Sequence, residues 1–456
     1  TVILAAQATG TTVDLAGGAD KLTLGAYVNT VTVSDVETLV GGASADTVVF
    51  GAAITGATVD LGTGGDTLTF DDAGATITVS NVETLNAGAA DDVVTLATQA
   101  TGISVDLAGG NDSLALGAFV NTLTVSNVEV LTGGASSDMI TLGSQLTDAS
   151  IDLAGGADRL TLGAFVNTLT VSNIETVVGA ASADTVTLAT QATGHSIDLG
   201  GEADKVTLGA FVNTVTLSNI ETVIGGATND AVTLATQATG TTLDLGAGLD
   251  TLTLRNFANT VTVFNVETII GGTLADAVTF GADVTGAVIN LGVGNDTLTF
   301  DASGATVTVS NAETIVGGGA DDHVTLATSV TALDLGGGAD GLVLANLVNT
   351  LTASNVETIT GGASADLVTL ATQATGSEID LGGGADRLTL GAFVNTVTVA
   401  NTETLTGGST DDLVTLTTQA TGATIDLGAG LDTLTLAGSV NTATIGNVET
   451  LTGGST

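Results

Sequence analysis

The chain has no cysteine, proline or tryptophan, and only 5 of its 456 residues are lysine or arginine. Without cysteine, disulfide bonds and thiolate chemistry are excluded. The chain also carries 49 acidic residues and a net charge of -44, which excludes nucleic acid as a ligand because phosphate binding needs a basic surface. Aromatic residues make up only 2% of the chain, so stacking platforms for sugars are missing.

Long hydrophobic runs are absent as well. No apolar stretch approaches the roughly 18 residues that a membrane helix needs, so we expect no insertion into a membrane. The chain does not have the composition of a disordered acidic tail, because 43% of its residues are hydrophobic and such tails are rich in proline. Valine, leucine and isoleucine alternate with threonine in short runs, which is typical of strands with one buried face.

One repeat of 46 residues runs through the chain in ten copies. Each copy has two glycine-rich turns that end on aspartate, first seen at Asp20 and Asp46, and the one irregular step, from Asp322 to Asp340, is two residues short. Strands as short as these bury their apolar faces only when successive coils stack. We therefore expect an all-β, parallel β-solenoid (a β-roll or β-helix) over residues 1–456, with about two coils per repeat.

Most of the acidic residues recur at four positions of the repeat: the two turn aspartates, the position of Asp14 and that of Glu37. Stacked coils would place equivalent carboxylates about 5 Å apart, and such ladders of like charge are destabilising. Calcium binds six to eight oxygens, so it can neutralise them. We predict multiple Ca²⁺ ions, about one per coil. The predicted ligands are the turn aspartates Asp20, Asp46, Asp66, Asp92, Asp112, Asp138, Asp158, Asp184, Asp204, Asp230, Asp250, Asp276, Asp296, Asp322, Asp340, Asp366, Asp386, Asp412 and Asp432.

Several positions leave alternatives open. The turn aspartates could instead cap local backbone N–H groups. Asp14 and its equivalents should point outward, where a solvated face and a metal ligand are both compatible with the pattern. A turn or surface role is favoured for the Glu37 position, and a turn or an amide ladder for the Asn29 position. His195 and His323 lie at unrelated points of the repeat, so we expect surface substitutions without a role.

The glycine turns resemble a known family. Residues 292–299, 246–253 and 41–48 are similar to the calcium-binding nonapeptide of RTX proteins, G-G-x-G-x-D-x-U-x, and residues 126–131 look like linkers in calcium-dependent surface-layer proteins of Gram-negative bacteria. This resemblance implies a parallel β-roll, calcium held between turns on adjacent coils, and type I secretion. The family's tandem turns place ions on both edges. Turns 18 to 26 residues apart predict instead one column of ions on one edge and a metal-free opposite edge.

The regularity of the repeat argues against catalysis, which needs a local break where unlike groups converge. We therefore expect no enzyme and no catalytic residues. Calcium dependence points to an extracellular or cell-surface location, where calcium is millimolar and weak sites suffice. Thr1 and Thr456 both fall inside the repeat pattern, without polar caps, so we expect a slice of a longer array or an end-to-end stack.

The expected function is that of a calcium-binding structural repeat protein in an extracellular surface layer, filament or stalk. The expected partners are other copies of the chain, joined end to end or laterally, and cell-surface polysaccharide. The alternative is a repetitive adhesin or a ligand-binding module for carbohydrate or ice, which regular outward rows of threonine could serve.

Overall fold

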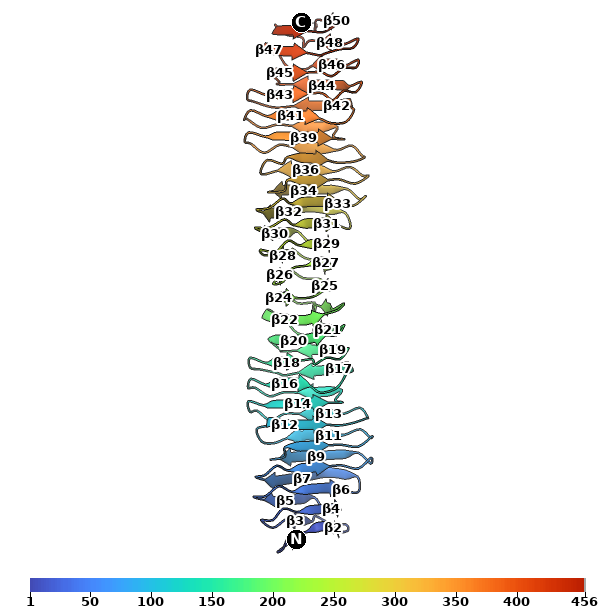
Figure 1. The fold of residues 1–456 in the computed structure, drawn as a ribbon, viewed down its shortest axis with the longest axis vertical. Coiled ribbons are helices and arrows are strands. Elements are labelled where there is room, and N and C mark those ends of the chain that lie inside the picture. Colours follow the sequence, from blue (N-terminus) through green and yellow to red (C-terminus); the bar gives the residue numbers. More distant parts are fainter. Residues whose placement is uncertain (455–456) are drawn as a thin grey trace. The chain divides into compact units, whose positions relative to one another are not determined.

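The computed structural model describes residues 1–454, and every regular element in them is a β-strand. The chain divides into two compact segments at residue 226. Within each segment consecutive strands alternate between two parallel sheets, so the chain winds as a parallel β-solenoid (Figure 1). The predicted fold class is therefore confirmed. No helix long and apolar enough to span a bilayer occurs in residues 1–454.

In the first segment, odd-numbered strands form one sheet and even-numbered strands form the other. The odd-numbered strands are β1 (Val2–Ile3), β3 (Lys21–Thr23), β5 (Thr38–Gly42), β7 (Ile54–Gly62), β9 (Ala75–Ser80), β11 (Val93–Leu96), β13 (Ser113–Ala115), β15 (Val130–Thr132), β17 (Thr147–Asp152), β19 (Thr168–Ser172), β21 (Thr185–Leu188), β23 (Lys205–Thr207) and β25 (Thr222–Gly226). The even-numbered strands are β2 (Thr9–Asp14), β4 (Thr30–Ser34), β6 (Thr47–Phe50), β8 (Thr67–Thr69), β10 (Thr84–Asn86), β12 (Thr101–Asp106), β14 (Thr122–Ser126), β16 (Met139–Leu142), β18 (Arg159–Thr161), β20 (Thr176–Ala181), β22 (Thr193–Gly201) and β24 (Thr214–Ser218).

The second segment follows the same rule. Its odd-numbered strands are β27 (Thr239–Gly246), β29 (Thr260–Phe264), β31 (Ala277–Phe280), β33 (Thr297–Phe300), β35 (Thr314–Val316), β37 (Ala332–Asp334), β39 (Thr350–Ser354), β41 (Leu367–Leu370), β43 (Arg387–Thr389), β45 (Thr404–Thr406), β47 (Thr421–Asp426) and β49 (Thr442–Gly446). Its even-numbered strands are β26 (Ala231–Leu234), β28 (Thr251–Thr253), β30 (Thr268–Gly272), β32 (Val284–Gly292), β34 (Ala305–Ser310), β36 (His323–Leu326), β38 (Gly341–Val343), β40 (Thr358–Thr360), β42 (Thr375–Asp380), β44 (Thr396–Ala400), β46 (Leu413–Leu416), β48 (Thr433–Thr435) and β50 (Thr450–Thr452).

Each 46-residue repeat supplies five strands, and because one coil takes two strands, a repeat spans two and a half coils. The sequence analysis predicted about two coils per repeat, and the structure adds a further half coil. Strands β2 and β7 hold equivalent residues of the first two repeats, yet β2 pairs with β4 in one sheet and β7 pairs with β5 in the other. Equivalent residues of neighbouring repeats therefore lie on opposite sheets. Only every second repeat returns to the same sheet.

The core follows from the alternation of residues along the strands. In β14, Leu123 and Val125 are buried, and the threonines and serine between and beside them point outward. Leu123 pairs with Ile140 of the next coil, and Val125 pairs with Val105 of the coil before. Each fully buried side chain of this size contributes about 1.5–3 kcal/mol. Stacking of coils thus supplies the apolar core that no single strand could form.

Close stacking requires glycine at particular turn positions. Gly62 has a φ of 89°, and a Cβ atom there would collide with the carbonyl oxygen of Gly42 on the preceding coil. We expect Gly62→Ala to lower the free energy of unfolding by roughly 1–3 kcal/mol, measured by thermal melting. Gly56 has a φ of 74° but open space around it, so Gly56→Ala measures the effect of backbone strain without a collision. Gly65 has neither a positive φ nor a close neighbour, so Gly65→Ala serves as the neutral control. Equal melting midpoints for all three variants would refute the steric argument.

Candidate metal centres and edge hollows

Each segment has two edges, one formed by turns that follow odd-numbered strands and one by turns that follow even-numbered strands. The glycine turns lie on both edges. Those ending at Asp46 and Asp66 follow β5 and β7, whereas those ending at Asp92 and Asp112 follow β10 and β12. The predicted single column with a metal-free opposite edge is therefore wrong. Because each repeat spans two and a half coils, the glycine turns of the next repeat lie on the opposite edge.

Glycine turns on adjacent coils stack in twos, and the backbone N–H of the first aspartate donates to Oδ1 of the second. The donor–acceptor distances are 2.6–2.7 Å. The predicted ligands meet as the pairs Asp46 and Asp66, Asp92 and Asp112, Asp138 and Asp158, Asp184 and Asp204, Asp230 and Asp250, Asp276 and Asp296, Asp322 and Asp340, Asp366 and Asp386, and Asp412 and Asp432. Asp20 is not paired with another predicted ligand in residues 1–454; its N–H donates to a glutamate. The expected continuous ladder of carboxylates is thus replaced by isolated pairs.

Most pairs are the centre of a stack of four inward side chains that cap backbone N–H groups; in the stacks of Asp92 and Asp322 the asparagine is missing, and these aspartates accept from the N–H groups of Ala75 and Ala305. In one stack, Asn29 accepts from the N–H of Ala8 at 3.0 Å, and Asp46 accepts from the N–H of Asn29 at 3.0 Å. Asp66 then accepts from Asp46, and Glu83 Oε2 accepts from the N–H of Asp66 at 2.8 Å. These side chains supply acceptors that the backbone cannot supply at the turn. The capping interpretation is therefore correct for one oxygen of each aspartate, although the N–H group comes from the neighbouring coil.

The asparagine and outward aspartate positions have structural roles. Nδ2 of Asn121 donates to the carbonyl of Phe119 and to Oδ1 of Asp138, both at 2.8 Å. The turn role predicted for the asparagines is confirmed, and they form no amide ladder. The outward direction predicted for the Asp14 position is also confirmed, since Asp106 is half-buried and accepts from Asn127 Nδ2 at 2.7 Å.

The outward position does not require a charge. Asn290 replaces aspartate there, and its Oδ1 accepts from Asn311 Nδ2 at 2.7 Å and from the N–H of Gly292 at 3.1 Å. Asp60 accepts the equivalent two hydrogen bonds, from Asn81 and Gly62. An amide oxygen therefore replaces the carboxylate oxygen at this position.

Most of the paired aspartates differ, because they keep one oxygen buried and unpartnered. In Asp138, Asp322 and Asp412 this oxygen instead accepts from an N–H of the same turn at 3.2–3.5 Å. Asp46 and Asp66 are 1% and 0% exposed, and Oδ2 of each has no hydrogen bond. Leaving a buried acceptor unsatisfied costs about 1–3 kcal/mol, and more when it is charged. Each such oxygen therefore calls for a proton or a cation. The same holds for Oδ2 of Asp92, Asp112, Asp158, Asp184, Asp204, Asp250, Asp276, Asp296, Asp340, Asp366, Asp386 and Asp432.

The protonation equilibria reflect this burial. Loss of solvent raises the pKa of Asp112, Asp158 and Asp250 to about 6 and that of Asp204 to about 7, with neighbouring carboxylates adding to the shift. At neutral pH the protein therefore holds these groups ionised at an energetic cost. A cation between the two turns would remove that cost.

The geometry offers an incomplete but suitable ligand set for calcium. Within residues 1–454 no three side chains of the His, Asp and Glu types are grouped closely enough to hold a metal. The pair of Asp46 and Asp66 offers two unpartnered carboxylate oxygens. Oδ1 of Asp66 lies close to its own glycine turn, 2.8 Å from the position that a Cβ atom on Gly64 would take. Because calcium binds six to eight oxygens, the remaining ligands would be carbonyls of the glycine turns and water.

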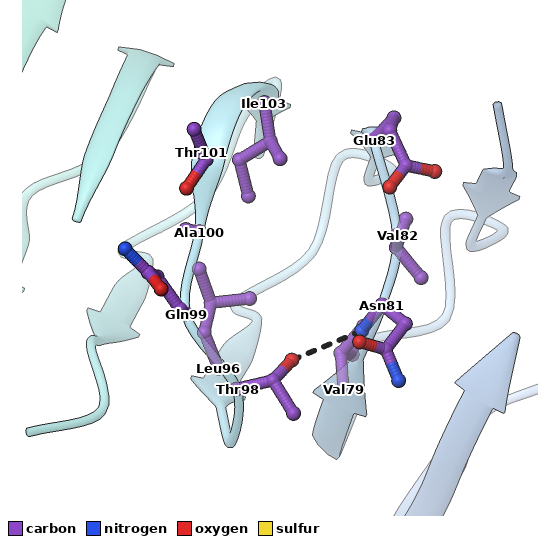
Figure 2. A pocket seen from close by; sticks show the side chains of 10 residues that line it. All are labelled: Val79, Asn81, Val82, Glu83, Leu96, Thr98, Gln99, Ala100, Thr101 and Ile103. Atoms are coloured by element: carbon purple, nitrogen blue, oxygen red, sulfur yellow. Dashed lines mark hydrogen bonds between the residues drawn. The ribbon is translucent and has the colours of Figure 1, made fainter. Parts of the chain in front are cut away.

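A second feature of each edge is a hollow next to the glutamate of the stack. Between residues 81–83 and the longer loop 97–101 of the next coil lies a cavity of about 130 Å³. Figure 2 shows Glu83 across this hollow from Thr101 and Ile103. The equivalent hollow beside Glu403 measures about 220 Å³, and Ala423 takes the place of Ile103 there. The hollow is thus a property of the repeat.

One histidine lies at this position of the repeat. His195 is 7% exposed, and its Nε2 lies 3.8 Å from Oε1 of Glu175. Burial lowers the pKa of His195, and Glu175 partly opposes the shift. The prediction of a surface substitution is therefore wrong for His195, whose side chain points inward like Ile103. The surface position is confirmed for His323, which is exposed on β36.

Sequence reasoning missed the asparagines before Val-Glu, such as Asn81 and Asn127, which have φ values of 52° and 53°. Asparagine is one of the few residues that adopt this left-handed conformation readily, so its recurrence there was the available signal. Comparison of the chain with protein-family models and with curated proteins found no match in either case.

Proposed function

We propose that the chain is a calcium-binding structural protein whose coils are held together by ions between paired glycine turns. The supporting observation is the set of buried, unpartnered aspartate oxygens, which occur in pairs on adjacent coils. The chain's 5 basic residues are too few to balance its 49 acidic ones. Calcium would thus act as the internal counter-ion of the solenoid, and the geometry favours one ion per pair over one per coil.

Calcium dependence on this scale suits an extracellular protein, because weak oxygen sites fill at millimolar calcium. We propose a surface layer, filament or stalk built from copies of this chain. The resemblance of the turns to RTX nonapeptides agrees with that role. The rival function, recognition of a repeating ligand by threonine rows, is less well supported: in register with Thr78 and Thr95 on the next coil stands Ala115, which interrupts the row.

Titration of the demetallated protein with calcium tests the proposal. We expect nine bound ions, one for each pair, measured by calorimetry and by elemental analysis after equilibrium dialysis. The double variant Asp46→Asn, Asp66→Asn should bind one ion fewer, because it removes both unpartnered charges of one pair. Asp106→Asn is the matched control, since asparagine already serves at the equivalent position 290. An unchanged count in the double variant would refute the assignment.

A further inference from the structure

The hollows beside the glutamates arise from loops of unequal length. Residues 81–83 form a tight turn, whereas loop 97–101 on the next coil is longer, and the two loops are joined by a hydrogen bond from the N–H of Asn81 to Thr98 Oγ1 at 3.1 Å (Figure 2). The space between them is therefore built into the repeat. It recurs beside Glu403 in the second segment.

The glutamate at the hollow uses only part of its hydrogen-bonding capacity. Oε2 of Glu83 accepts from the N–H of Asp66, which fixes the carboxylate at the rim. Its other oxygen, Oε1, has no hydrogen bond to residues 1–454. Glu403 is held in the same way by the N–H of Asp386. Each hollow thus contains a positioned carboxylate oxygen that is free to accept from a donor.

One repeat shows which chemical group fits there. At the position of Ile103 the fifth copy carries His195, whose imidazole is buried with Nε2 directed at Oε1 of Glu175 at 3.8 Å. The glutamate keeps its other hydrogen bond, from the N–H of Asp158 at 2.8 Å. An imidazole therefore occupies this position beside the carboxylate without disturbing the stack.

The residue at this position also sets the size of the hollow. With Ile103 the cavity measures about 130 Å³, and with Ala423 it measures about 220 Å³. Ala57, Ala149 and Ala287 occupy the position in other copies, each buried. Several copies thus lack the side chain that would fill the space.

We propose that these edge hollows bind small organic cations that carry N–H donors, an imidazolium or a primary ammonium, with the glutamate as the counter-charge. The chain's net charge of -44 raises the local concentration of cations along both edges. His195 is the covalently attached counterpart of such a ligand. These sites are separate from the aspartate pairs and do not depend on calcium binding there.

Binding of imidazolium and methylammonium to the full chain in millimolar calcium tests the proposal, with tetramethylammonium as a control cation that has no N–H donor. We expect both probes to bind and the control not to bind. His195→Ala should gain one imidazolium site. Ala423→His should lose one, because the new side chain would fill its own hollow. Glu403→Gln should weaken binding at that hollow at least tenfold while keeping an acceptor for the N–H of Asp386.

Calorimetry supplies the site counts, and methyl NMR of Ile103 reports directly on one hollow. This second measurement needs no variant, so a folding defect in His195→Ala cannot obscure the result. Equal binding of tetramethylammonium and methylammonium would overturn the proposal, as would an unchanged count in both Ala423→His and His195→Ala. A chain that stays folded with no calcium at the aspartate pairs would contradict the proposed calcium sites and leave these expectations intact, so the two hypotheses fail independently.

Discussion

Removal of calcium at neutral pH is expected to abolish the cooperative fold. Each ion that binds only the folded chain adds about 2.7 kcal/mol at a free concentration 100-fold above its dissociation constant, so nine ions would add on the order of 20 kcal/mol. That exceeds the usual net stability of a domain, about 5–15 kcal/mol. We expect circular dichroism to lose its β-sheet signal on chelation and small-angle scattering to show an expanded chain.

Magnesium provides the matched control for this experiment. It demands near-ideal octahedral geometry and gives up water reluctantly, so it should restore the fold poorly at the same concentration. Restoration by calcium alone would identify a specific site, whereas equal restoration by both ions or by high salt would indicate simple screening. An unchanged β-sheet signal after complete chelation would contradict the role given to the aspartate pairs.

The demetallated protein is expected to be more stable in acid than at neutral pH. Burial raises the pKa of Asp112, Asp158 and Asp204, so the folded chain binds more protons than the unfolded chain between about pH 4 and pH 7. The stabilisation by protons is fully present below the unfolded pKa of 3.8 and is lost as the pH rises through the folded values, ending with Asp204 at about 7. We expect a cooperative melting transition near pH 4, a midpoint that falls by about 10 °C or more as the pH rises, and no transition at neutral pH.

Calcium should reverse this slope, because it competes with protons for the same oxygens. The midpoint of the loaded protein should therefore rise between pH 4 and pH 7. Asp204→Asn isolates one contribution, since it removes the group that ionises last, and it should let the demetallated protein keep its melting transition up to a higher pH. A demetallated protein that gains stability with rising pH would contradict the raised pKa values.

Much of this architecture could be predicted from periodicity. The alternation of apolar residues with threonine specifies which side chains point inward, as Leu123 and Val125 show, and the regular aspartates mark the turns. An alignment of the ten repeats does not show which residues lie next to each other on adjacent coils. Aligning Asp20 with Asp66 assumes that equivalent residues stack, whereas five strands per repeat place them on opposite edges. Counting the strands in one repeat would have revealed the alternation.

The candidate sites were predicted only in part. The turn aspartates are recognisable because glycine precedes them. Their hydrogen bonds join residues 17 and 20 apart, and the sequence does not show which spacings bring residues onto adjacent coils. His195 was misjudged for a related reason. Its copies elsewhere are alanine, isoleucine, serine or threonine, and an inward position that tolerates such different side chains gives no clear hydrophobic pattern. The hollows beside Glu83 and Glu403 show that this position has room for side chains of different size.

The half-integral coil count also bears on how such an array can change length. Recombination between neighbouring copies would add or delete 46 residues, and every loop downstream in the segment would rotate by half a turn about the axis. Because the two flanks carry the same loops in alternation, the shortened or lengthened segment would present unchanged chemistry to its surroundings. Successive repeats are thus related as by a two-fold screw axis. A change in the number of repeats alters the length of the array but not the kinds of loop on either flank.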